Sequence, residues 1–164
     1  IKNICKYAIV GHSERRDVFK EDNFMIKEKL SRCWENDITP ILCIGESLKI
    51  RENGIKEIKE HLFFQLDNSL SPDSNWENII VAYEPIWAIG TGLSATKNEI
   101  QEITDLLNDK LSVLSNSYDI PVLYGGSVND DNFKDFQNIN SLSGFLIGSA
   151  SLDPTILSKI INDF

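Results

Sequence analysis

The stretch IIVAYEPIWAIGTG, residues 79–92, carries the most information about the fold and chemistry of this chain. Its first five residues are apolar at every position, which is typical of a strand buried on both faces of a parallel sheet. Glu84 follows this strand directly. The stiff Pro85 and the pliable glycines further along are typical of a lid with a hinge. We therefore expect a strand that ends at a catalytic cleft.

Four other short apolar runs are similar to this strand, and they alternate with segments of helical spacing. The runs lie at residues 7–10, 39–44, 122–124 and 145–147. Apolar residues at intervals of three and four predict amphipathic helices over residues 26–34, 55–66 and 100–114. Two helix starts are also indicated, by a capping box at residues 96–99 and by Asp153 in front of Pro154.

The alternation of strands and helices predicts an α/β fold of five strand–helix units. The spacing of about 30 residues per unit matches a (β/α)8 barrel, which has eight units in about 250 residues. An open, flavodoxin-like sheet of five strands fits the same count. Periodicity alone therefore leaves both architectures open.

Composition limits the classes of partner and the compartment. The 164 residues correspond to one domain. With 25 acidic against 16 basic residues, the net charge of -9 argues against nucleic acids and anionic membranes as partners. No apolar run reaches the ~18 residues of a membrane span. Cys5, Cys33 and Cys43 form no C-x-x-C pair, which indicates free thiols in a reducing cytoplasm and no zinc site.

Two titratable residues follow predicted strands and are candidates for catalysis. His12 lies at the start of a turn or helix, where a neutral imidazole can donate a hydrogen bond to a substrate oxygen. Glu84 lies where loss of water favours its neutral form and sharpens its basicity. A structural histidine and an ion-paired carboxylate are the alternatives. His61, in a polar helical segment, is expected at the surface.

The last two predicted strands are followed by small residues, at 124–128 and 148–152. Such clusters let backbone N–H groups approach a phosphate, and neither cluster contains Lys or Arg. Glu46, after the second strand, is expected to support the site or form an ion pair rather than perform chemistry. Cys43 is expected to be a buried thiol with no base beside it.

Taken in order, these motifs resemble the triosephosphate isomerase family over essentially the whole chain. The stretches that carry the resemblance are IVGHSERR at 9–16, ILCIGE at 41–46, VAYEPIWAIGTG at 81–92, YGGSV at 124–128 and GFLIGSASL at 144–152. The resemblance implies a (β/α)8 TIM barrel. It also implies that residues 1–164 form a single partial domain with about five βα units, strands 4–8 of the barrel, and without the first three.

The resemblance further implies the reaction and the roles of residues. Dihydroxyacetone phosphate and glyceraldehyde 3-phosphate would interconvert through an enediol, in glycolysis and gluconeogenesis, in a cytoplasmic homodimer without metal or organic cofactor. His12 would polarise the carbonyl and Glu84 would move the proton. Ser13 and Glu14 would support this pair. The main-chain N–H groups that would bind the phosphate belong to Gly90, Ser127, Gly148 and Ser149.

Three departures from the family pattern matter. The first three units would carry a lysine that supplies positive charge, so we expect the isolated chain to have little or no isomerase activity. Ser149 stands where the family has glycine, and Asn108 and Ser143 replace an Arg–Asp pair.

One alternative is an inactive partial barrel that acts only by associating with a separate N-terminal piece. Another is a different phosphate-binding barrel enzyme, against which the glutamate and lid stretch argues.

Overall fold

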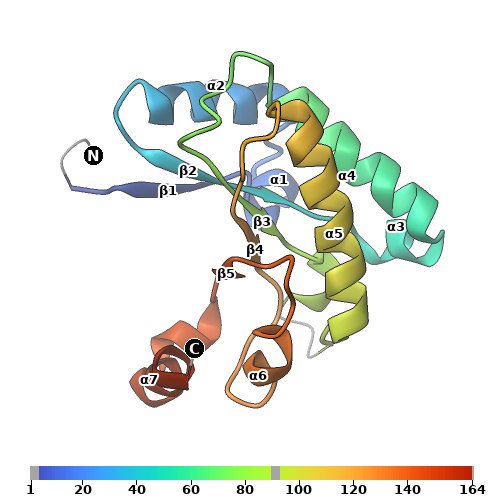
Figure 1. The fold of residues 1–164 in the computed structure, drawn as a ribbon, viewed down its shortest axis with the longest axis vertical. Helices are drawn as coiled ribbons and strands as arrows, with labels where there is room; N and C mark the ends of the chain where they lie inside the picture. Colours follow the sequence, from blue (N-terminus) through green and yellow to red (C-terminus); the bar gives the residue numbers. More distant parts are fainter. Residues whose placement is uncertain (1–3, 90–92, 164) are drawn as a thin grey trace.

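The computed structural model describes residues 4–89 and 93–163, which form one parallel sheet with helices packed along it (Figure 1). The strands are β1 (Tyr7–Val10), β2 (Thr39–Ile44), β3 (Ile80–Tyr83), β4 (Val122–Tyr124) and β5 (Gly144–Phe145). They lie in the order β1-β2-β3-β4-β5, and each pair is parallel. This sequential order differs from the 2-1-3-4-5 order of flavodoxin-like sheets, and it is the order of neighbouring strands in a barrel.

The helices confirm the predicted periodicity. They are α1 (Ser13–Asp17), α2 (Asn23–Trp34), α3 (Leu48–Glu52), α4 (Ile55–Ser69), α5 (Lys97–Leu114), α6 (Phe133–Phe136) and α7 (Pro154–Asp163), with short 3-10 turns η1 (Ile86–Ala88) and η2 (Ser149–Leu152). Helices α2, α4 and α5 lie side by side along the sheet, whereas α6 and α7 lie beyond β5 (Figure 1). Apolar residues of α4 and α5 such as Leu62 and Leu107 are buried between helix and sheet.

The strand at the β1 edge differs from its prediction, which expected burial on both faces. Val10 is buried, but Tyr7 and Ile9 are 58% and 53% exposed. Because side chains alternate along a strand, Tyr7 and Ile9 share the face opposite to Val10. The helices pack on the Val10 face, and β1 pairs only with β2 among the described strands, so the other face of this edge stays open. The fifth strand is also shorter than predicted and ends at Phe145.

Helix α5 begins with the predicted capping box. The Thr96 hydroxyl accepts a hydrogen bond from the Glu99 amide at 3.3 Å, and the Glu99 carboxylate accepts one from the Thr96 amide at 2.7 Å. We expect Thr96→Ala to lower the free energy of unfolding by about 1 kcal/mol, because an amide at the helix start loses its acceptor. Urea unfolding measures the effect. Thr155→Ala, at an exposed position of α7, is the matched control, and an equal loss there would contradict the assignment.

Candidate active site

A cavity of about 210 Å³ lies at the carboxyl ends of the strands. It brings together five of the residues that the sequence singles out, which come from four separate segments. They are His12, Glu84, Ser127, Gly148 and Ser149. The predicted phosphate ligand Gly90 lies outside the described residues. Parallel strands present their carboxyl ends at one edge of the sheet, which is why residues so far apart in sequence meet here.

Glu84 is the most buried polar group of this cavity. It follows β3 directly, its backbone amide donates to the Ile44 carbonyl at 2.8 Å, and the residue is only 2% exposed. Burial raises the pKa of the Glu84 carboxyl, against the opposing effects of His12, the Ser13 amide and the Cys43 thiol. A carboxylate in this state is a stronger base than one in water.

His12 faces Glu84 across the cavity. Its Nε2 lies 3.3 Å from Oε1 of Glu84, and its Nδ1 accepts a hydrogen bond from the Glu14 amide at 3.3 Å. A ring nitrogen that accepts a hydrogen bond carries no proton, so this contact fixes the tautomer with the proton on Nε2. The His12 side chain is 31% exposed, so its Nε2–H group is accessible from the cavity.

The two residues after His12 contribute through their backbones. The Ser13 amide donates to Oε2 of Glu84 at 3.2 Å, whereas His12 lies against the other carboxylate oxygen. The Glu14 amide orients the His12 ring, but its carboxylate is exposed and has no hydrogen bond or ion pair to any described residue. Within residues 4–89 and 93–163, the Glu14 side chain therefore makes no hydrogen bond or ion pair with His12 or Glu84.

The glycines after β4 are required by packing. A Cβ atom on Gly126 would lie 2.3 Å from the Tyr124 hydroxyl oxygen, and one on Gly125 would lie 3.0 Å from Cγ of Glu84. Gly148 differs, because a Cβ there would meet no atom within 4 Å. Steric contacts thus explain the first glycine pair, and they do not explain Gly148 at the start of η2.

Comparison with known proteins now gives the family. A profile of the triosephosphate isomerase family matches residues 2–164. The chain belongs to the triosephosphate isomerase family. It is 40% identical over 164 residues to triosephosphate isomerase of Aquifex aeolicus, and 42% identical over 156 residues to that of a Sulfurovum species. The crystal structure of triosephosphate isomerase from Bartonella henselae superposes with a TM-score of 0.87 at 31% identity.

The match covers nearly all of this chain but not all of its relatives. It includes 98% of the chain against the Aquifex aeolicus protein, 95% against the Sulfurovum protein and 96% against the Bartonella henselae structure. The same alignments cover 65%, 64% and 64% of those three chains. The chain therefore spans slightly less than two thirds of the length of the triosephosphate isomerases that it matches.

Hydrogen bonds of α5 stand in place of the Arg–Asp pair of the triosephosphate isomerase pattern. Asn108 on α5 donates to the backbone carbonyl of Ser141 at 2.9 Å, and the Thr104 hydroxyl bonds the Ser141 hydroxyl at 2.7 Å. Ser143 itself is exposed. Neutral hydrogen bonds to Ser141 thus link α5 to the segment before β5.

Two sequence expectations near Glu84 are wrong. Cys43 is fully buried as expected, but the Glu84 carboxylate lies near its thiol, and burial together with this charge raises the thiol pKa far above its usual range. His61 is half-buried rather than at the surface, and its Nε2 donates to the Gly45 carbonyl at 3.2 Å. Cys43 lies near Glu84 because of the register of β2 against β3, in which Cys43 pairs with Ala82. This register cannot be predicted from apolar runs.

Sequence reasoning also missed the support behind Glu84. A Cβ atom on Gly45 would lie only 1.7 Å from the Glu84 carbonyl oxygen, so only glycine fits at this crossing. The buried amide side chain of Gln65 holds the Gly45 peptide, accepting from its N–H at 2.9 Å and donating to its carbonyl at 3.3 Å. Helix α4 therefore helps to fix the backbone on which Glu84 rests.

Glu46 forms the expected ion pair and belongs to the support of the segment after β3. It is fully buried, and its Oε1 accepts from the Tyr83 hydroxyl at 3.1 Å and the Trp87 indole at 2.8 Å. The Arg51 guanidinium lies 3.5 Å from the same oxygen. Burial raises the pKa of Glu46 despite these partners. The carboxylate thus ties β3, η1 and α3 together.

The raised pKa of Glu84 has a consequence for stability. A folded-state carboxyl with a raised pKa favours folding at low pH, and this contribution is lost as pH rises through that pKa. We expect Glu84→Gln to be more stable than the wild-type chain at pH 7, and the difference to shrink as pH falls toward 4.5. Urea unfolding across this range measures it. A variant that is less stable at pH 7 would contradict the expectation.

No metal cluster or membrane helix accompanies this site in the described part of the chain. Residues 4–89 and 93–163 contain no group of three or more His, Cys, Asp or Glu side chains placed to hold a metal ion. No helix within the same ranges is long and apolar enough to cross a membrane. The three cysteines are unpaired, as the sequence predicts.

Proposed function

We propose that this chain carries the catalytic pair and part of the phosphate site of a triosephosphate isomerase, which interconverts dihydroxyacetone phosphate and glyceraldehyde 3-phosphate. One observation carries the proposal. A buried carboxylate and an imidazole lie 3.3 Å apart in a cavity that is also lined by the backbone turns after β4 and β5. Proton transfer next to a carbonyl needs such a base and such a hydrogen-bond donor in one dry site.

The proposed reaction follows from the positions of the two side chains. The Nε2–H group of His12 donates a hydrogen bond to the substrate carbonyl oxygen as negative charge develops there. Glu84 removes a proton from the carbon next to the carbonyl, while Nε2 of His12 passes its proton to the carbonyl oxygen, which gives an enediol. The Glu84 carboxyl then returns its proton to the former carbonyl carbon, and Nε2 of His12 recovers a proton from the hydroxyl on the other carbon, which becomes the new carbonyl. The residues end in their starting state, so no oxidant or reductant is consumed.

The phosphate is proposed to bind at the opposite end of the cavity. Ser127 follows β4, while Gly148 and Ser149 begin η2, and all three line the cavity. Their backbone N–H groups suit an anion, and Gly90 is proposed as a further donor. Among the described residues that line this cavity there is no Lys or Arg. We propose that the complete site takes its positive charge from outside the described segments.

The architecture and surroundings of the site are part of the same proposal. We propose that residues 1–164 form one partial TIM-barrel domain, which corresponds to the C-terminal five βα units, strands 4–8. Sequential parallel pairing and the 64% coverage of the Bartonella henselae chain support this reading. The complete enzyme is proposed to be a cytoplasmic homodimer that needs no metal or organic cofactor. The alternative of an inactive partial barrel that associates with a separate piece has no observation of its own.

A hybrid protein tests the proposal. The part of the Aquifex aeolicus relative outside the aligned region is fused in front of this chain, and isomerase activity is followed by a coupled assay that consumes NADH. We expect the hybrid to be active and the 164-residue chain alone to have little or no activity. A hybrid that unfolds cooperatively but lacks activity would contradict the proposed function. Turnover by the chain alone at the rate of the intact Aquifex aeolicus enzyme would contradict the need for an outside cation.

A further inference from the structure

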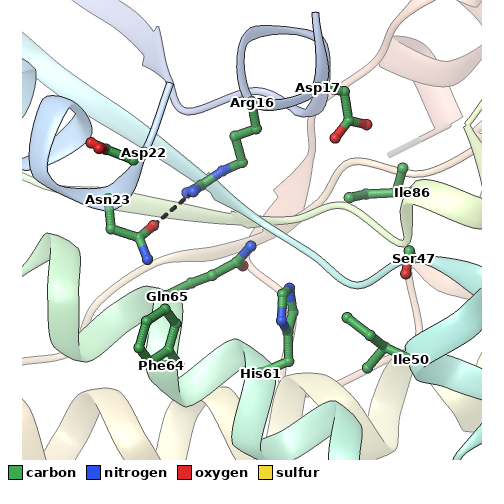
Figure 2. Close-up of a pocket in the computed structure, with 10 residues that line it drawn as sticks. All are labelled: Arg16, Asp17, Asp22, Asn23, Ser47, Ile50, His61, Phe64, Gln65 and Ile86. Carbon is green, nitrogen blue, oxygen red and sulfur yellow. Dashed lines mark hydrogen bonds between the residues drawn. The ribbon is translucent and has the colours of Figure 1, made fainter. Parts of the chain in front are cut away.

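A second cavity, of about 390 Å³, lies on the helix-covered side of the sheet (Figure 2). Its walls come from α1, the start of α2, the turn after β2, α3, α4 and η1. No described residue lines both this cavity and the candidate active site. Its volume falls in the range of sites for small organic molecules.

Apolar side chains line two sides of the second cavity. Ile50 of α3 and Ile86 of η1 lie on the same side in Figure 2, and Phe64 of α4 lies across from them. Phe64 is 60% exposed, although it belongs to the large aromatic residues that are stabilised by burial. These three side chains provide contact surface for a ring of a bound molecule.

Arg16, which lines this cavity, is already engaged. The Arg16 guanidinium donates to the Gly11 carbonyl at 2.7 Å, to Asn23 Oδ1 at 2.8 Å and to the Cys43 carbonyl at 3.0 Å. Figure 2 shows its contact with Asn23. These neutral oxygens hold the guanidinium in place, and the two aspartates among the described residues that line this cavity outnumber its single positive charge. The second cavity is therefore unlike the proposed phosphate site.

The free polar groups of this cavity favour a cation with hydrogen-bond donors. Asp17 is exposed and makes no ion pair with a described residue. His61 donates from Nε2 to Gly45, which leaves Nδ1 as an acceptor, and burial lowers its pKa, so the ring is neutral. In Figure 2 the Asp17 carboxylate lies above His61 and on the same side as Ile86. A negative group, a neutral acceptor and an apolar wall thus border one space.

We propose that this cavity is a second ligand site, which binds a small aromatic amine. The aromatic ring packs against Ile50, Phe64 and Ile86, and the ammonium group interacts with Asp17. His61 accepts a further hydrogen bond from the ligand through Nδ1. The site does not depend on the proposed isomerase activity, because it uses none of the residues of the catalytic cavity.

Titration of the 164-residue chain with tryptamine tests the proposal by NMR. We expect saturable chemical-shift changes centred on Ser47, His61 and Ile86. Indole-3-propionate has the same ring and chain length as tryptamine but ends in a carboxylate. We expect it to bind about tenfold more weakly than tryptamine, because the Asp17 carboxylate repels it. Equal binding of the two compounds, or shifts that do not map to the cavity, would overturn the proposal.

Two variants with a matched control refine this test. Phe64→Ser should weaken tryptamine about tenfold by removing an apolar wall, and Asp17→Asn should weaken it about threefold, as expected for an exposed ion pair. Phe24→Ser is the control, because Phe24 is 70% exposed on α2 and does not line the cavity. Each variant is first checked for native NMR dispersion. If Phe64→Ser and Phe24→Ser weakened tryptamine binding equally, the proposed site would be wrong. If one of the variants unfolds, the comparison of tryptamine with indole-3-propionate still tests the site.

Discussion

Replacing Glu84 by glutamine in the hybrid enzyme is expected to lower kcat by about 10²–10⁴-fold, with little change in KM. Glutamine keeps an oxygen that accepts from the Ser13 amide, so the local structure is retained while the base is lost. Glu84→Asp should also lower kcat, by about 10²-fold, because the shorter side chain withdraws the carboxylate by about 1 Å from its proton. Steady-state kinetics with the coupled assay measures both effects.

The pH dependence of the wild-type hybrid gives an independent check on Glu84. On acidification, kcat/KM should fall when Glu84 becomes protonated. Because burial raises the pKa of this carboxyl, the fall should occur at a higher pH than for a carboxyl in water. Glu57→Gln, on the exposed side of α4, is the control for kinetics and should leave kcat unchanged. A folded Glu84→Gln variant with undiminished kcat would show that another group is the base.

Replacing Gly45 by alanine is expected to have the largest effect on stability, a loss of about 3 kcal/mol in the free energy of unfolding. The added Cβ would overlap the Glu84 carbonyl oxygen, at 1.7 Å, and a backbone atom cannot rotate away as a side chain does. The neighbouring strands are tied by the bond from the Glu84 amide to the Ile44 carbonyl, and Gln65 holds the Gly45 peptide from behind. Relief of the overlap must therefore separate β2 from β3 or break those bonds.

Urea unfolding of the 164-residue chain measures this loss. Gly148→Ala is the matched control, because its Cβ would meet no atom within 4 Å, and its stability should stay within about 0.5 kcal/mol of the wild type. If Gly45→Ala were as stable as Gly148→Ala, the close crossing of the two strands would be wrong.

The elements and the meeting of His12 with Glu84 could be predicted because their signals are local. Short apolar runs mark the strands, and the bounds of β1, β2 and β4 agree with the prediction. The first residues after β1 and β3 include His12 and Glu84, and parallel topology brings such positions to one edge of the sheet. The cavity formed by these residues is thus largely a consequence of the strand pattern.

The support of the site could not be predicted, because it depends on register and on packing between distant elements. Gln65 looks like any polar residue of a surface helix, and only the rotation of α4 against β2 directs its amide to Gly45. Likewise, the proximity of Cys43 to Glu84 can be predicted only when the register of β2 against β3 is known. The open face of β1 was missed because an apolar run does not reveal whether a second layer covers it.

The sequential strand order described above also affects how the chain reaches its native state. Each strand pairs with its successor, so the paired residues lie roughly 20 to 40 residues apart in the chain. Such short separations lower the entropy lost on closing each loop and favour rapid folding. A ribosome adding residues one by one would release each βα unit next to a partner that is already in place. Assembly can then proceed as repeated addition at one growing edge, without a late search for a distant strand.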